Sequence, residues 1–272
     1  MSFRKETAGA AAEMPAWPRN FLTILFFAAG ALVLARLVHT TGKPDWPAAV
    51  LLLLAVASTL AALARHMPLQ NVLSAAGFIG IVGGTAEWLD LKTGIPFGQF
   101  TPGTNAGPEP FSALPWALPF VWAVAILNSR GVARLILRPW RKNHGYGFWL
   151  IGVTAALTAL FDLALEPFAS RVNHFWFWVP VKFPMSWQGV PLANFLGWLV
   201  VTLLILAFAT PMLINKQPQK RRPPDFHPLG VWLGGILLFA VAAALNRLWA
   251  ATAADAVIGI VTAVFAIRGA RW

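Results

Sequence analysis

Long apolar runs constrain this chain more than any other feature of its sequence. The runs at 46–64 and 190–213, for example, contain no charged residue. About 20 helical residues cross the hydrocarbon core of a bilayer, so runs of this length predict membrane helices. Of the whole chain, 58% is hydrophobic and only 11% is charged. These observations exclude an ordinary soluble domain and predict an all-α, polytopic membrane helix bundle.

The apolar runs predict eight spans, with seven as the alternative count. The segments between them are too short for a separate soluble domain, so we expect one integral membrane domain over residues 1–272 with a polar tail at 1–19. The first run is long for a signal-peptide core and lacks a small-residue cleavage site, so we expect it to be retained. The expected spans are 20–38, 46–64, 71–91, 113–128, 148–167, 190–213, 229–249 and 254–268.

Basic residues predict how the bundle is oriented. Most of the 21 Lys and Arg residues fall at the N-terminus and in alternate connections, including the clusters at Arg130–Lys142 and Lys216–Arg222. Positively charged connections stay in the cytoplasm, so we expect both termini to be cytoplasmic in a multi-pass protein of the cytoplasmic membrane. The net charge of +11 is then explained by topology and anionic lipid, and we expect no nucleic-acid partner.

Four acids are expected to meet at one level of the membrane. Glu87 and Asp90 are three residues apart, and Asp162 and Glu166 are four apart, so each pair shares a helix face. Both pairs lie near the ends of spans that run outward. The sixth span starts at the same level and brings Asn194 to it. This convergence is the strongest functional signal in the sequence.

Carboxylates at this depth need an explanation. They are costly in or near a bilayer, and they usually face a bundle interior or a water-filled cavity. Helix C-termini disfavour negative charge, so capping does not account for them. Either a cation offsets them or some remain protonated, and a neutral carboxylic acid is a proton donor. The alternative is that they are solvated at the interface or paired with Lys92 or Arg171.

Aromatic residues surround these acids in the sequence. The Gly94–Gly98 segment predicts a helix stop and a tight turn, because Gly permits positive φ and Pro ends a helix. We expect this turn to fold aromatic rings back over the acids. Aromatic faces stabilise cations, although Trp also forms belts at membrane interfaces. The candidate ring residues are Phe97, Phe100, Trp176, Trp178 and Trp198.

These residues together resemble the membrane carotenoid biosynthesis proteins, which include bacterial carotenoid 1,2-hydratases and archaeal bisanhydrobacterioruberin hydratases. The similarity runs over residues 75–205 and is most specific in the Gly189–Trp198 segment. The other matching features are Glu87, Thr93–Gly98, Asp162, the Glu166–Pro167 pair and the Trp176-x-Trp178 pair.

The resemblance implies addition of water to the terminal C1=C2 double bond of an acyclic carotenoid dissolved in the membrane. On this hypothesis Asp162 or Glu87 donates the proton. Asp90 or Glu166 orients the water with help from Asn194, and the aromatic residues form the substrate wall. The net reaction is neither redox nor energy-coupled, so no cofactor is expected.

Two other interpretations remain open. Acidic pairs on membrane helices are also used by intramembrane prenyltransferases to hold Mg²⁺ on a diphosphate, although the Asp-rich motifs of those enzymes are missing here. A non-enzymatic carotenoid-binding or transport protein is the other alternative. The five histidines have no paired ligand spacing, so we expect no metal site. The sequence gives no oligomeric state.

Overall fold

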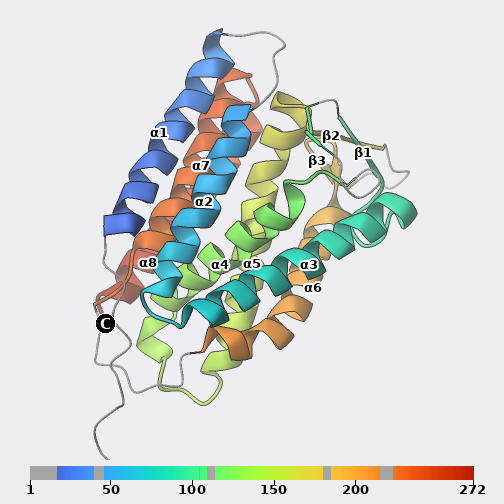
Figure 1. The fold of residues 1–272 in the computed structure, drawn as a ribbon. Coiled ribbons are helices and arrows are strands. Elements are labelled where there is room, and N and C mark those ends of the chain that lie inside the picture. The colour runs from blue at the N-terminus through green and yellow to red at the C-terminus, as the bar shows by residue number, and fades with distance from the viewer. Residues whose placement is uncertain (1–16, 40–45, 104, 109–113, 180–184, 215–222) are drawn as a thin grey trace, which may run out of the picture.

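The computed structural model describes residues 17–39, 46–103, 105–108, 114–179, 185–214 and 223–272, and it is dominated by eight long helices (Figure 1). The N-terminal residues 1–16 and the basic cluster Lys216–Arg222 lie outside the described residues. The long helices are α1 (Trp17–His39), α2 (Trp46–Ala64), α3 (Leu69–Thr93), α4 (Leu118–Ile136), α5 (Tyr146–Glu166), α6 (Leu192–Ala209), α7 (His227–Leu245) and α8 (Trp249–Ala270).

The helices form a single bundle around α4. In Figure 1, α1, α2, α7 and α8 lie on one side, and α3 crosses the other side at a steep tilt. Helix α4 packs against α2, α3, α5, α7 and α8. Seven of the described helices are long and apolar enough to cross a membrane. This confirms the expected polytopic all-α membrane bundle.

Helix α4 differs most from its expected position. It covers 118–136, whereas the sequence analysis placed a span at 113–128. Neighbouring helices shelter it from lipid, so it carries Asn128, Ser129 and Arg130 in buried positions. The Asn128 amide donates to Thr59 Oγ1 at 2.9 Å, and the indole of Trp232 donates to Ser129 at 3.1 Å. Polar residues that look like a span ending are therefore contacts inside the bundle.

Short strands close one end of the bundle, which the sequence analysis did not anticipate. Strand β1 (Phe100–Pro102) pairs antiparallel with β2 (Trp176–Trp178), and Phe100 lies opposite Trp178. Strands β3 (Ser186–Trp187) and β4 (Val190–Pro191) form a hairpin. Its two turn residues, Gln188 and Gly189, both have positive φ, as a tight two-residue hairpin turn requires. Each strand is too short for a period-two pattern to reveal it.

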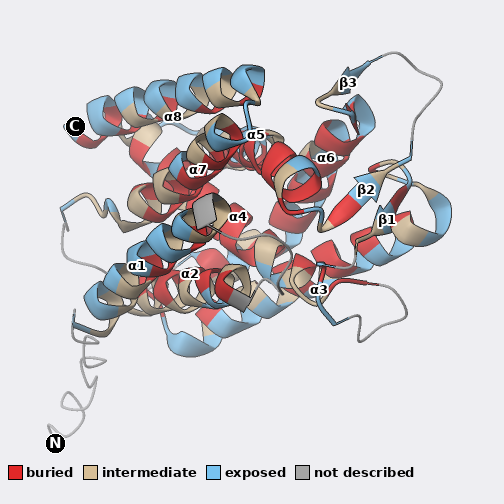
Figure 2. Ribbon diagram, turned by 90° about the horizontal axis from the view of Figure 1, so that it is seen from above, coloured by how far each residue is buried: buried red, intermediate tan, exposed pale blue. Residues whose placement is uncertain are grey.

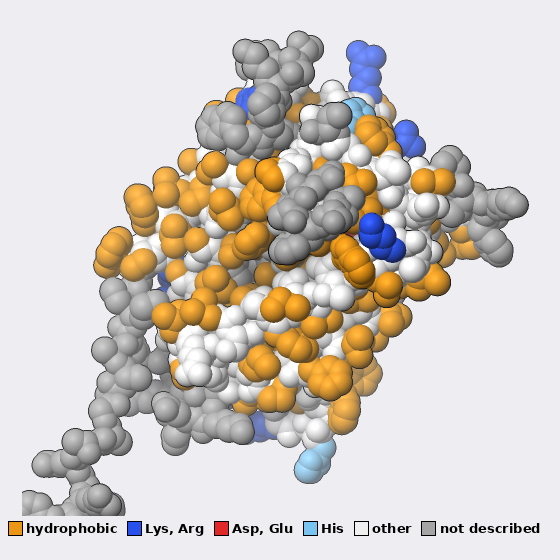
Figure 3. Space-filling model, turned by 45° about the vertical axis from the view of Figure 1, so that its right-hand side comes forward, with side chains coloured by type: hydrophobic (Ala, Val, Ile, Leu, Met, Phe, Trp, Pro, Cys, Tyr) orange, Lys and Arg blue, Asp and Glu red, His pale blue; other side chains and the backbone are white. Residues whose placement is uncertain are grey.

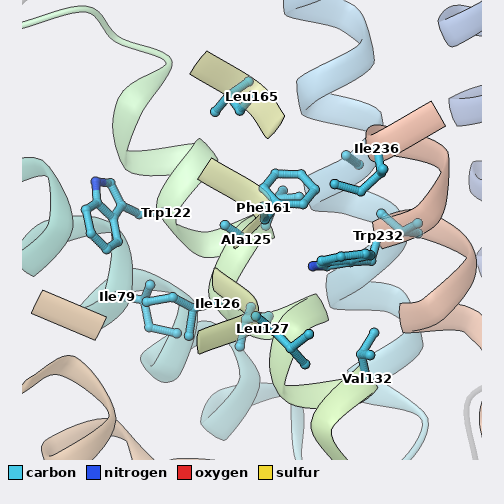
Figure 4. Packing of buried hydrophobic residues seen from close by; sticks show 14 of the residues in the cluster. Ile79, Trp122, Ala125, Ile126, Leu127, Val132, Phe161, Leu165, Trp232 and Ile236 are labelled. Carbon is cyan, nitrogen blue, oxygen red and sulfur yellow. The ribbon is translucent and has the colours of Figure 1, made fainter. Parts of the chain in front are cut away.

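Hydrophobic side chains cover the flanks of the bundle as well as filling its core. The outward helix surfaces are exposed and the inward surfaces are buried (Figure 2). Hydrophobic side chains are spread over the whole flank in Figure 3, where no Asp or Glu is visible. In the core, Phe161 of α5 lies beside Ala125 of α4 and faces Trp232 and Ile236 of α7 (Figure 4). The ring centroids of Phe161 and Trp232 are 5.9 Å apart.

A polar cluster joins α1, α2 and α7 where α1 and α7 begin and α2 ends. The Asp225 carboxylate lies 3.6 Å from the Arg19 guanidinium and 3.3 Å from His66 Nε2. The backbone N–H of His227 donates to the same carboxylate at 3.1 Å. Partial burial opposes ionisation, but the contacts with His66 and His227 prevail and lower the pKa of Asp225 from 3.8 to about 2.

We therefore expect Asp225→Asn to destabilise the protein in a pH-dependent way. A lowered folded-state pKa gives stability that is fully present above the unfolded pKa and is lost as pH falls toward about 2. The variant should lose about 2 kcal/mol at neutral pH, since one pKa unit corresponds to about 1.4 kcal/mol. Thermal unfolding in detergent should show this gap closing in strong acid. An equal gap at pH 7 and near pH 2 would contradict the assignment.

Candidate active site

Glu87, Asp90, Asp162 and Glu166 meet at the end of the bundle where α3 and α5 finish and α6 begins. All four carboxyl side chains are buried, and the most accessible, that of Glu87, is 5% exposed. Among the described residues, the ion pairs within 4.0 Å join Asp225 to Arg19 and His66 and involve none of these four acids. Solvated acids, or acids paired with Lys92 or Arg171, are therefore not what the structure contains.

Three of these acids line one small cavity. Glu87 of α3, Asp162 and Glu166 of α5, and Asn194 of α6 all contribute to its wall. The cavity has a volume of about 10 Å³, which is on the order of the space needed by one water molecule. Its remaining wall is apolar and includes Phe100, Trp176, Trp178 and Trp198. A single buried water can therefore touch several carboxyl groups here.

Asp162 and Asn194 form the closest polar contact of the site. The Asn194 amide donates to Asp162 Oδ2 at 2.6 Å, and both side chains are almost completely buried. The second oxygen, Asp162 Oδ1, is also buried, and no described residue offers it a hydrogen bond. A buried polar atom normally has a partner, so Oδ1 is the oxygen of Asp162 that is available to a water or a substrate. Asn194 fixes the orientation of this carboxyl group.

Trp122 is a site residue that the sequence analysis missed. Its indole N–H donates to Glu87 Oε1 at 3.0 Å. Its ring stacks on Trp198 with centroids 3.7 Å apart and planes 5° apart. Trp122 lies in the apolar run of α4, and no nearby polar residue marked it as different from a lipid-facing tryptophan. Only the arrangement of α3, α4 and α6 reveals its role.

Glu166 is held by the two tryptophans of β2. Oε2 accepts the indole N–H groups of Trp176 at 3.1 Å and Trp178 at 2.8 Å. Residues two apart on a strand share a face, so the extended strand aims both indoles at one carboxyl oxygen. The sequence analysis expected these tryptophans to contribute ring faces, whereas the structure uses their N–H groups. After Glu166, the chain continues from Pro167 to Val172 as a turn of π-helix.

Asp90 has a different environment from the other three acids. Its Oδ1 accepts the backbone N–H groups of Phe97 at 2.7 Å and Gly98 at 3.1 Å. It does not contribute to the described cavity wall. Helix α3 ends at Thr93, and Gly94 follows with φ +70°, so the expected helix stop and turn are confirmed. Asp90 therefore holds the turn that follows its own helix.

The turn places Phe97 and Phe100 at different distances from the acids. Phe100 lines the cavity and lies 5.4 Å from the Trp178 ring, centroid to centroid. Phe97 is fully buried behind the stacked pair, 5.9 Å from Trp122 and 6.5 Å from Trp198. It supports the cavity wall without reaching the cavity. Of the five aromatic residues expected around the acids, Phe97 alone is missing from the cavity wall.

These features define a polytopic α-helical membrane protein with a buried, aromatic-walled acidic cavity. The chain belongs to the carotenoid biosynthesis protein family, whose family model matches residues 47–265. This confirms the resemblance noted from the sequence, and it extends beyond the 75–205 segment that carried it.

A bisanhydrobacterioruberin hydratase from Haloarcula japonica is one relative of this chain. The two are 31% identical over 125 residues, which make up 45% of this chain and 40% of the relative. This chain therefore matches less than half of that protein's length. No solved structure matches the chain.

Proposed function

We propose that this protein adds water to the terminal C1=C2 double bond of an acyclic carotenoid within the membrane. Its family places it in carotenoid biosynthesis, and its relative is named as a hydratase. The observation that carries the proposal is the meeting of Glu87, Asp162 and Glu166 around a buried cavity of one-water size.

The reaction needs a proton, a stabilised cation and a positioned water. A carboxylic acid gives its proton to C2, and the electron pair of the double bond forms the new C–H bond. The tertiary cation left at C1 is then captured by water, which loses a proton to a carboxylate. The product has gained one H and one OH, so no oxidant or cofactor is required.

Asp162 is the proton donor in this proposal. Three ionised carboxylates around one buried cavity would repel one another strongly, so the group shares protons. Oδ2 of Asp162 is occupied by the Asn194 amide, while Oδ1 has no partner among the described residues. A proton on Oδ1 is therefore free to move to an alkene. Asn194 acts as a positioning residue for this carboxyl group.

Glu166 and Glu87 have complementary roles. Glu166 accepts two indole N–H groups, which hold its carboxyl group at the cavity in a position to stabilise the cation. Glu87 is fixed by Trp122 and orients the attacking water. The ring of Trp198 contributes a π-face to the same wall. Asp90 positions the turn that carries Phe97 and Phe100 and takes no direct part.

The membrane orientation is part of the same proposal. Basic residues lie at the C-terminal ends of α2, α4 and α8, namely Arg65, Arg134 and Arg268. Basic ends of membrane helices remain in the cytoplasm. We place both termini in the cytoplasm and the acidic cavity near the opposite surface.

Expression of the unaltered protein in a lycopene-accumulating cell tests the proposal. We expect carotenoids that carry the mass of one added water per reacted end, seen by chromatography and mass spectrometry, together with a tertiary hydroxyl group. An empty-vector culture provides the control. Lycopene that co-purifies with the protein but is never hydrated would overturn the proposal and favour a carotenoid-binding role.

A further inference from the structure

A second, much larger cavity lies beside the acidic one. It has a volume of about 720 Å³ and is lined by α1, α2, α4, α5 and α7 together with the segments that precede α4. We call it the chamber. Of the five aromatic residues expected to bind substrate from the sequence, only Trp176 lines it. The chamber was therefore not visible from the sequence.

The chamber is chemically suited to a hydrocarbon. Its wall is almost entirely aliphatic and aromatic, with Phe26, Phe161 and Phe239 among its rings. Asn105 is the one described wall residue with an amide side chain, and its Nδ2 is already used in a hydrogen bond to the Asn173 carbonyl at 3.0 Å. No described wall residue is charged. A diphosphate or a lipid headgroup would lose its hydration here without compensation.

The chamber and the acidic cavity share a wall. Leu118 and Val121 of α4, Leu165 of α5 and Trp176 of β2 line both spaces. Leu165 precedes Glu166 in the chain, and Trp176 donates its indole N–H to Glu166. Side chains of this shared wall therefore lie between the chamber and the carboxyl groups.

We propose that the chamber binds the terminal segment of a long, uncharged polyene chain and presents its end to the acids across this shared wall. This proposal rests on the proposed hydration, which determines which part of the bound chain faces the acids. It adds a binding site that is lined by residues other than the acids. The chamber volume of about 720 Å³ is typical of a binding site for one small ligand, for which the usual range is roughly 300–1,000 Å³. In this proposal the chamber holds the end of the carotenoid, and the bilayer holds the remainder of the chain.

Helix α2 offers a matched pair of substitutions to test the chamber. Ala49 lines it, whereas its neighbour Val50 is 39% exposed and does not. Ala49→Phe places a ring in the chamber, and Val50→Phe places the same ring on the outer surface. Ala55 also lines the chamber, and Ala55→Leu adds less volume there. This variant replaces Ala49→Phe in the experiment if Ala49→Phe fails to fold.

The experiment measures lycopene binding, which does not depend on the hydration reaction. Each substitution is combined with Asp162→Asn, and the double variant is expressed in lycopene-accumulating cells. The measurement is the amount of lycopene bound per mole of purified protein. We expect Ala49→Phe and Ala55→Leu to lower retained lycopene about tenfold, which corresponds to about 1.4 kcal/mol. Val50→Phe should retain as much as Asp162→Asn alone. Thermal unfolding confirms that each variant is folded.

The outcomes separate the two proposals. Equal lycopene retention by the filled and control variants overturns the chamber, whatever the unaltered protein does to lycopene. Selective loss in the filled variants supports the chamber even if no hydrated product is ever found, in which case the proposed hydration fails alone.

Discussion

Replacement of Asp162 by Asn should abolish hydration while leaving the protein folded in the membrane. The amide has nearly the same shape as the carboxyl group, so the contact with Asn194 can be rebuilt, but no proton can be delivered to the alkene. A positioned general acid contributes about 10²- to 10⁴-fold to rate, and a loss of this size would remove detectable product. The measurement is hydrated carotenoid per unit of membrane-inserted protein in lycopene-accumulating cells.

Asp90→Asn provides the matched control for this experiment. Asp90 is as deeply buried as Asp162, and it undergoes the same chemical change. Its amide oxygen can still accept the N–H groups of Phe97 and Gly98, so the turn should persist and hydration should continue. We expect Glu87→Gln to behave like Asp162→Asn. Full activity in both Asp162→Asn and Glu87→Gln would exclude these acids from the chemistry.

The meeting of the acids could be predicted because it depends on features that a sequence displays directly. Span lengths and alternating direction place the ends of α3 and α5 at one level, and helical spacing places Asp162 and Glu166 on one face. Hydrocarbon makes each buried carboxyl costly, so their presence already implies a shared interior. The role of Gly94 in ending α3 followed from backbone sterics alone.

The partners of the acids could not be predicted, because they depend on how the helices pack. Trp122 and an ordinary lipid-facing tryptophan look the same in a sequence. Asp90 could not be separated from Glu87, because both lie on one face and the difference arises from a turn whose N–H groups reach only Asp90. The chamber is built by α1, α2, α4 and α7 as well as by α5, the helix that carries Asp162 and Glu166. Apolar runs predict that helices exist but not the space between them.

Gly83→Ala should destabilise the protein and impair hydration, although alanine is the better helix former. A Cβ atom at Gly83 would lie 2.3 Å from Cγ and 2.6 Å from Cδ2 of Trp122. That ring cannot retreat easily, since Trp198 stacks on it at 3.7 Å and Phe97 lies nearby. Overpacking costs about 1–3 kcal/mol, and a displaced Trp122 also leaves Glu87 without its donor. We expect the free energy of unfolding, measured by thermal unfolding, to fall by about 2 kcal/mol, and we expect less hydrated carotenoid to form.

Gly77→Ala on the same helix isolates the cause. A Cβ at Gly77 meets nothing within 4 Å, so the substitution brings only the helix propensity gain of up to about 1 kcal/mol. Gly77→Ala should therefore unfold at the same or a higher temperature and hydrate normally. If Gly83→Ala matched it in both assays, Trp122 would not be wedged against α3, and the fixed position of Glu87 would need another explanation. If Gly83→Ala lost stability but kept full activity, the indole of Trp122 would be structural only. Loss of both is expected, because one glycine admits the ring that packs α3 against α4 and α6 and also holds a carboxyl group of the cavity.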